Sequence, residues 1–220
     1  MEPEFITYQK FNDIGLANEL TEVLNKHHIK YSIEEASQTF DPTFSFNPLA
    51  KEYAIKISSD DFERVNQILK EEESENIDGV DKDYYLFSFT NDELMEVVTK
   101  ADEWSPFDVV LSRKILDQRG IKISEKDLVE KEKNRISELK KTKPLSTIQL
   151  VICYIFAIGG GLIGIPIGWH MTTAKKTLPD GEQVYGYTED DRWHGRIILY
   201  ISIVDFALAL LYKFGILFPG

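Results

Sequence analysis

The chain has 220 residues, with 37 acidic and 25 basic side chains and a formal net charge of −12. This acidity argues against nucleic-acid binding, which needs concentrated Lys and Arg. The single cysteine, Cys153, excludes a disulfide framework and a zinc site built from several cysteines. Residues 1–144 hold 31 acidic and 20 basic residues, whereas residues 145–220 hold six and five, with two long apolar runs. We therefore expect an acidic soluble part joined to a membrane part.

The first 75 residues show the hydrophobic periodicities of a small α/β domain. Alternating apolar residues predict strands near 5–8, 29–33 and 53–57, and helical spacing predicts helices over 13–27 and from Ser58, where Asp61 would complete a capping box. The order β-α-β-β-α supplies most of a ferredoxin-like sandwich, an α+β fold with helices on one face of an antiparallel sheet.

Several of these segments resemble the bacterial signal-transducing protein family with a small α/β domain of P-II-like type. They are the strand from Phe5 to Tyr8, the helix containing ANEL, the strand HHIKYSI and the stretch YAIKISSDDFERVNQIL, together covering roughly residues 4–72. A later string, FTNDELMEVVTKADEWSPFDVVLSRKILDQRG, is similar to a segment of membrane-anchored members from Bacteroidetes-type bacteria. The resemblance implies a role in signalling, and its motifs are apolar patterns that contain no catalytic residues.

A long segment over residues 37–51 joins the second and third predicted strands. It carries Phe40, Phe44 and Phe46 and two prolines. Long ordered loops are often functional, so these phenylalanines are candidates for a partner or ligand groove. Alternatively, they cover the open face of the sheet.

Residues 84–143 are predicted to form a helical hairpin followed by a linker helix. Thr90 with Glu93 fits a capping box, and Ser105 before Pro106 marks a second helix start. Trp104 lies between these helices, where it would be a partner hot spot or part of the hairpin core. A further charged helix runs to about residue 142 and would lead to the bilayer or form a short coiled coil.

Residues 144–220 are predicted to form a two-helix transmembrane hairpin with a short extracytoplasmic loop. The runs Leu145–Trp169 and Ile197–Phe218 are each long enough to cross the hydrocarbon layer as one helix. A buried helical pair of a soluble protein is the alternative. The turn sequence Pro179-Asp180-Gly181 lies between the runs and predicts a small β-hairpin in that loop.

The orientation follows from the basic residues that flank these runs. Seven lie on the side of the two termini and four in the connecting loop, and no secretory segment opens the chain. We therefore expect a multi-pass protein of the cell inner membrane with its N-terminus in the cytoplasm.

Small residues recur every four positions in the first apolar run, at Gly160, Gly164 and Gly168. Such a stripe lets another helix approach closely, either the second run or a second copy of the chain. Pro166 lies among them and is expected to kink the helix.

Asp205 is the most unusual residue of the second run, because a carboxylate within a membrane is costly and often functional. In an antiparallel hairpin it would lie at the depth of Tyr154. A hydrogen bond to Tyr154 or to a backbone carbonyl is the simplest expectation, and a homo-oligomeric pore lined by Asp205 is a weaker alternative.

Two histidines, His170 and His194, flank the loop between the runs. They could share a metal ion, but they are more simply part of an interfacial aromatic belt, so no metal and no cofactor are expected.

No nucleophile, acid–base pair or phosphate loop stands out in the sequence, so no catalysis is expected. The leading hypothesis is a membrane-anchored cytoplasmic sensing or adaptor protein that docks a partner at the inner membrane face. The alternative is an accessory subunit of a membrane transporter or envelope complex. The expected partners are the lipid bilayer and a protein, which could be a second copy of the chain.

Overall fold

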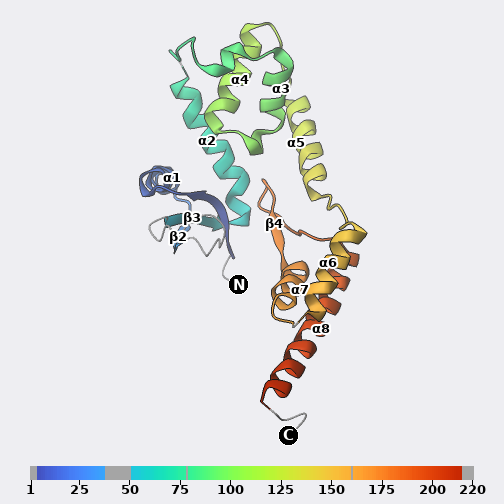
Figure 1. Cartoon of the computed structure of the whole chain (residues 1–220). Helices are drawn as coiled ribbons and strands as arrows, with labels where there is room; N and C mark the ends of the chain where they lie inside the picture. Colours follow the sequence, from blue (N-terminus) through green and yellow to red (C-terminus); the bar gives the residue numbers. More distant parts are fainter. Residues whose placement is uncertain (1–3, 38–50, 78, 160, 215–220) are drawn as a thin grey trace. The chain divides into compact units, whose positions relative to one another are not determined.

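The computed structural model describes residues 4–37, 51–77, 79–159 and 161–214. The chain divides into two compact units (Figure 1). Unit 1 comprises Met1–Glu138 and Thr177–Glu182, and unit 2 comprises Leu139–Lys176 and Gln183–Gly220. Helices and two small sheets make this a mixed α+β protein, as the sequence predicts.

An antiparallel sheet of three strands opens unit 1. Its elements are β1 (Phe5–Phe11), α1 (Ile14–Lys26), β2 (Tyr31–Ser37), β3 (Lys51–Ser58) and α2 (Phe62–Asn76). The strand order is β1-β3-β2, and Ile57 of β3 pairs with both neighbouring strands. Leu24, Ile55, Ile57 and Val65 are fully buried between the sheet and its two helices. In the described part of the chain this sheet has no fourth strand, which a complete ferredoxin-like sandwich would require.

The start of α2 differs from the predicted capping box. A short 3-10 turn over Ser59–Asp61 precedes the helix, and neither Ser58 nor Asp61 makes a side-chain cap. The tighter turn moves the start of α2 by three residues, so Asp61 rather than Ser58 lies at the N-cap position of α2.

Three further helices complete the larger part of unit 1: α3 (Asn91–Thr99), α4 (Pro106–Gln118) and α5 (Glu125–Lys140). Both halves of the predicted Thr90–Glu93 capping box are present. Ser105 caps α4 through the amide of Asp108 at 3.1 Å. Helices α3 and α4 pack against each other around a core of buried aliphatic residues, namely Leu86, Leu94, Val97, Leu111, Ile115 and Leu116.

The turn Thr177–Glu182 packs inside unit 1, against the start of α2. The side-chain amide of Asn66 donates to the carbonyl oxygen of Pro179 at 3.0 Å, and Leu178 is buried. Gly181 has a φ of +84°, and a Cβ there would lie 2.6 Å from the carbonyl oxygen of Ser59. The turn therefore requires a glycine both for its backbone and for its close approach to α2.

The first apolar run of unit 2 forms two helices, α6 (Thr147–Ile158) and α7 (Gly164–Thr173). The expectation of one spanning helix over Leu145–Trp169 is therefore wrong. Gly161 has a φ of +73°, and a Cβ at this position would lie 2.2 Å from the carbonyl oxygen of Ser202. Pro166 lies in the first turn of α7, where a missing amide hydrogen is tolerated, so it does not kink a longer helix.

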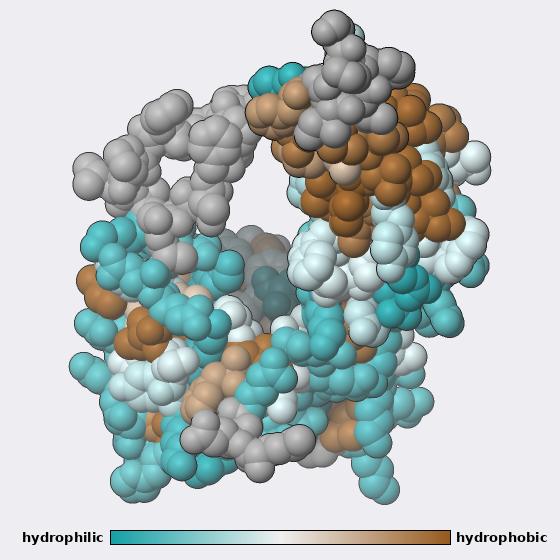
Figure 2. Space-filling view, turned by 90° about the horizontal axis from the view of Figure 1, so that it is seen from below, coloured by the Kyte–Doolittle hydropathy of each residue, from teal (hydrophilic) through white to brown (hydrophobic). Residues whose placement is uncertain are grey.

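A single long helix, α8 (Glu189–Lys213), follows the short hairpin of β4 (Lys175–Thr177) and β5 (Gln183–Tyr185). Within the described ranges, α8 is the one helix long and apolar enough to cross a membrane. Its exposed apolar residues contribute to the hydrophobic area in Figure 2, and they include Ile203, Val204, Leu208, Leu210 and Leu211.

The contacts within unit 2 give the direction of each helix. Gly168 of α7 faces Gly195 and Leu199 of α8, whereas Gly164 faces Ser202, so α7 and α8 are antiparallel. The amide of Leu145, just before α6, donates to Asp191 in the first turn of α8. Helices α6 and α8 therefore begin at the same end of the unit, and α7 ends there.

Candidate functional site

A groove of about 780 Å³ is the candidate site, and it lies entirely within unit 1. Its walls come from α2, the end of α3 with the 3-10 turn after it, α4, α5, the segment that joins α4 to α5, and Pro179. A volume of this size falls in the range of ligand-binding pockets, about 300–1,000 Å³.

Apolar side chains form much of the groove lining. Val109 is buried in the helical core, whereas Val129 on α5 is 49% exposed. The apolar members of the lining are Ile77, Val98, Ala101, Val109, Val110, Ile121, Ile123, Leu128, Val129 and Ile136. The groove thus leaves a strip of aliphatic surface accessible to a binding partner.

The charged residues of the groove are more basic than the unit around them. Six are basic, namely Lys70, Arg113, Lys114, Lys122, Lys131 and Arg135, and four are acidic, namely Glu71, Asp102, Asp117 and Glu132. Residues 1–144 as a whole have 31 acidic and 20 basic side chains. The groove therefore carries a local excess of positive charge in an acidic unit.

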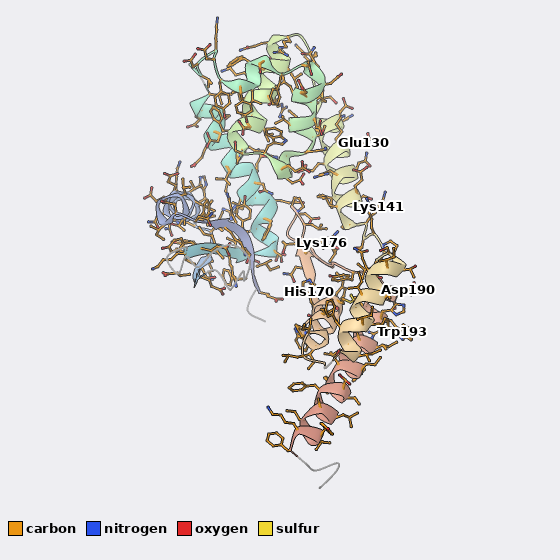
Figure 3. All side chains as sticks on the ribbon, in the orientation of Figure 1. Glu130, Lys141, His170, Lys176, Asp190 and Trp193 are labelled. Carbon is orange, nitrogen blue, oxygen red and sulfur yellow. The ribbon has the colours of Figure 1, made fainter. Side chains whose placement is uncertain are left out.

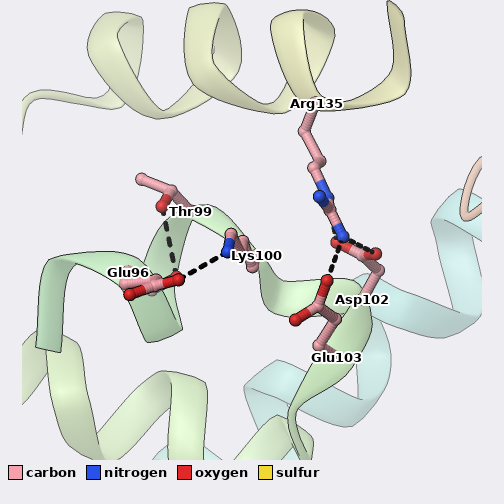
Figure 4. A network of polar contacts seen from close by, with 6 residues as sticks. All are labelled: Glu96, Thr99, Lys100, Asp102, Glu103 and Arg135. Atoms are coloured by element: carbon pink, nitrogen blue, oxygen red, sulfur yellow. Dashed lines mark hydrogen bonds and ion pairs between the residues drawn. The ribbon is translucent and has the colours of Figure 1, made fainter. Parts of the chain in front are cut away.

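Arg135 holds α5 at one side of the groove (Figure 4). Its Nε and Nη2 atoms donate to the two carboxylate oxygens of Asp102 at 3.0 and 2.8 Å, and Nη2 also contacts Glu103. The Asp102 carboxylate raises the pKa of the Arg135 guanidinium further above its already high value. Arg135 is therefore charged at every physiological pH, and the ion pair fixes the distance between α5 and the end of α3.

On the opposite side of the groove, basic side chains donate hydrogen bonds to backbone carbonyl oxygens. The ammonium group of Lys114 on α4 donates to the carbonyl oxygen of Ile77, just after α2, at 3.2 Å. The guanidinium of Arg119 donates to the carbonyl oxygens of Phe89 and Phe87 at 2.7 and 3.0 Å. These bonds join α2 and the α3–α4 hairpin into one scaffold behind the groove.

Of the aromatic residues predicted for a groove, Trp104 can be placed, and it does not line this one. Trp104 is half-buried in the helical core, where its ring lies 6.2 Å from that of Phe89 in an edge-on arrangement. Phe40, Phe44 and Phe46 lie outside the described residues.

Two of the three predicted packing glycines face α8. A Cβ on Gly164 would lie 2.1 Å from the Oγ of Ser202, and one on Gly168 would lie 2.6 Å from the backbone nitrogen of Leu199. Gly160 lies outside the described residues. Gly195 on α8 also lies close to α7, because a Cβ added there would lie 2.7 Å from the Cβ of Met171. This glycine does not belong to the predicted stripe of glycines spaced four residues apart.

The polar residues of the apolar runs have partners other than those expected. The hydroxyl of Tyr154 lies 2.9 Å from the Nδ1 of His194 on the first turns of α8, not beside Asp205. The expected Tyr154–Asp205 pairing is therefore wrong, because α6 runs parallel to α8 rather than antiparallel. His170 instead packs edge-on against the ring of Tyr187.

Asp205 is half-buried on α8 and has interactions within the structure. No group of three His, Cys, Asp or Glu side chains in the described ranges could hold a metal ion. His170 and His194 have separate ring partners, Tyr187 and Tyr154.

Thr188 and Asp191 fit a capping box in the sequence, and the structure adds a contact of Asp191 that this spacing does not predict. Asp191 is 3% exposed and accepts hydrogen bonds from the amide of Leu145 and the hydroxyl of Thr188. Its cap on α8 was predictable from the Thr188 spacing, but its link to Leu145 was not. The Ser146–Gln149 capping box of α6 was also present as a sequence signal.

Comparison with protein-family models, with curated proteins and with solved structures finds no match to this chain in any of the three.

Proposed function

We propose that this protein is a membrane-anchored adaptor that docks a partner protein in the groove of unit 1, at the cytoplasmic face of a membrane. The groove carries this proposal, because an accessible aliphatic strip with a basic rim is a binding surface, and the chain also contains an apolar helix suited to a bilayer. Binding without catalysis also agrees with the signalling role that the resemblance over residues 4–72 implies.

The chemistry of the groove favours a helical partner segment with apolar and acidic side chains. Its lining combines aliphatic residues with an excess of two basic over acidic residues. An amphipathic helix can bury its apolar face in such a groove. Acidic residues beside that face would meet Lys122 and Lys131, which are exposed on the rim.

Site-specific crosslinking tests the proposal in the full chain. A photoreactive residue at Val129 places the probe in the groove, and the same residue at Leu16, which is 51% exposed on α1, is the matched control outside it. We expect a protein adduct at Val129 that is absent at Leu16 and is lost in the Lys122→Glu/Lys131→Glu variant. Sequencing of the adduct should give a segment whose apolar residues recur every three or four positions, with acidic residues beside them.

Two results would reject the proposal. One is the same set of adducts at Val129 and Leu16, which would mean that the groove has no selectivity. The other is an adduct at Val129 that the double charge reversal leaves unchanged, because the basic rim would then have no role in docking.

A further inference from the structure

We propose that α8 alone crosses the bilayer, and that α6 and α7 form a re-entrant hairpin that enters and leaves the membrane on one side. The turn Thr177–Glu182 then stays on the same side as the rest of unit 1. This inference rests on the membrane anchoring of the proposed function but not on the groove. It replaces the topology of two crossings with an extracytoplasmic loop.

The first support is the position of the turn that joins the two apolar runs. Asn66 on α2 donates to the carbonyl oxygen of Pro179, and Gly181 lies against the backbone of Ser59 and the ring of Phe62. These contacts are internal to unit 1. A segment packed on a folded domain cannot be separated from it by a bilayer, so the end of α7 and the start of α8 must be on the side of unit 1.

The second support is the length of the helices in the first run. Helix α6 has 12 residues, which corresponds to about 18 Å, whereas the hydrocarbon core is about 30 Å thick. The chain then turns at Gly161, and α7 returns antiparallel to α8. Gly164 lets α7 approach α6 closely, since a Cβ added at Gly164 would lie 2.7 Å from the Cα of Ala157 on α6. A short helix that turns back in this way enters the membrane without crossing it.

Non-helical backbone at membrane depth is tolerated where protein covers it. The segment between α6 and α7 meets this condition, because Gly161 contacts the backbone of Ser202 and the residue Phe206 on α8. The α8 helix thus covers the turn of the re-entrant hairpin.

The third support is a polar end of unit 2. Asp191 accepts the Leu145 amide, and the ammonium group of Lys176 donates to the carbonyl oxygen of Lys141 at 3.4 Å. Figure 3 shows Lys141, Lys176 and Asp190 near the end where α6 and α8 begin. Trp193, exposed on the first turns of α8, suits the headgroup region at that end.

The far half of α8 has the opposite character. Val204, Leu208 and Tyr212 are 59%, 49% and 69% exposed. About 25 Å of helix α8 lies between Arg196 and Lys213, whose long side chains can reach the headgroups, so α8 is long and apolar enough to cross the hydrocarbon layer where α6 is not. Lipid is the occupant that this long, apolar and exposed face fits.

The distribution of basic residues becomes more asymmetric in the new topology. On the side of unit 1 lie Lys131, Lys133, Arg135, Lys140, Lys141, Lys143, Lys175, Lys176, Arg192 and Arg196, and near the other end of α8 lies Lys213. Ten basic residues against one is a stronger positive-inside bias than seven against four. The bias places unit 1 in the cytoplasm and the end of α8 outside.

Cysteine labelling in oriented membrane vesicles tests this topology in the full chain. Cys153 is the sole native cysteine, so Cys153→Ser gives a background without thiols. Three reporters are added singly: Glu19→Cys on α1, Thr177→Cys in the turn, and a cysteine in a tag after Gly220. A membrane-impermeant maleimide then reports the side of each, and alkaline carbonate extraction reports membrane integration.

We expect the Glu19 and Thr177 reporters to react from the same face and the tag from the opposite face. Labelling of Thr177 and Glu19 from opposite faces would overturn the proposal in favour of two crossings. Labelling of all three from one face would overturn it as well, because α8 would then not cross. Release of the chain into the carbonate supernatant would instead remove the membrane anchoring on which both proposals rest.

A second measurement uses the unaltered chain. Lys30 and Lys175 are both exposed, the first in unit 1 and the second in β4. An impermeant amine reagent should modify both from the same face. Modification of the two lysines from opposite faces would overturn the proposal independently of any cysteine variant.

Discussion

The ion pair between Arg135 and Asp102 is predicted to control the opening of α5 and thereby the width of the groove. Its two side chains are 18% and 16% exposed, and two parallel hydrogen bonds join them. A charge-assisted, bidentate pair in this setting should contribute about 1–3 kcal/mol. That energy corresponds to a roughly 5–150-fold change in the local opening equilibrium.

Unit 1 contains a matched comparison for this pair. Lys100 and Glu96 form an ion pair at helical i,i+4 spacing, and their side chains are 38% and 57% exposed. An exposed pair of this kind contributes little to stability, because solvent screens its charges. The structure therefore predicts that the Arg135–Asp102 coupling exceeds the Lys100–Glu96 coupling several-fold.

Native-state hydrogen exchange in the full chain measures both couplings, through the α5 amides for Arg135–Asp102 and through the α3 amides for Lys100–Glu96. A double-mutant cycle of Arg135→Ala and Asp102→Ala gives the first, and a cycle of Lys100→Ala and Glu96→Ala gives the second. Faster exchange in α5 is expected for Arg135→Ala but not for Lys133→Ala, which removes an exposed cation of the same helix. Equal coupling energies in the two cycles would refute the argument that partial burial and bidentate geometry decide the strength of the Arg135 pair.

Two further predictions concern packing and pH. Gly168→Ala should destabilise unit 2 by about 1–3 kcal/mol in thermal unfolding in detergent, because its Cβ would lie 2.6 Å from the backbone of Leu199. Gly186→Ala is the control and should be neutral, because its Cβ would make only ordinary contacts. Similar losses in both variants would contradict the packing argument. The hydrogen bond from Lys26 is the main cause of a lowered pKa of the Glu72 carboxyl group. The charged pair therefore stabilises the fold at pH values above the unfolded-state pKa of about 4.3. This stabilisation is lost as the pH falls through the lower folded-state pKa. The difference in Tm between the wild type and Glu72→Gln should therefore shrink as the pH is lowered from 6 towards 3, and a difference that stays constant would show that the carboxylate charge is not responsible.

The sequence by itself determined the local elements of unit 1. The alternation at Ile55 and Ile57 and the spacing of Leu20 and Leu24 identify strand and helix, because the buried face repeats with the period of each element. The Thr90–Glu93 cap was equally predictable, since both partners lie within four residues and their hydrogen bonds form wherever the helix starts.

The tertiary structure decided how the apolar part of the chain is arranged. One continuous helix and the two separate helices α6 and α7 contain the same apolar residues, so hydropathy does not separate the two arrangements. The choice depends on Gly161 and Gly164 meeting Ser202 some forty positions later, and on Asn66 holding the Pro179 carbonyl from more than a hundred positions away. Such contacts have no local periodicity, because they depend on which surfaces meet after the chain has folded, and the same is true of Arg135 and its carboxylate partners.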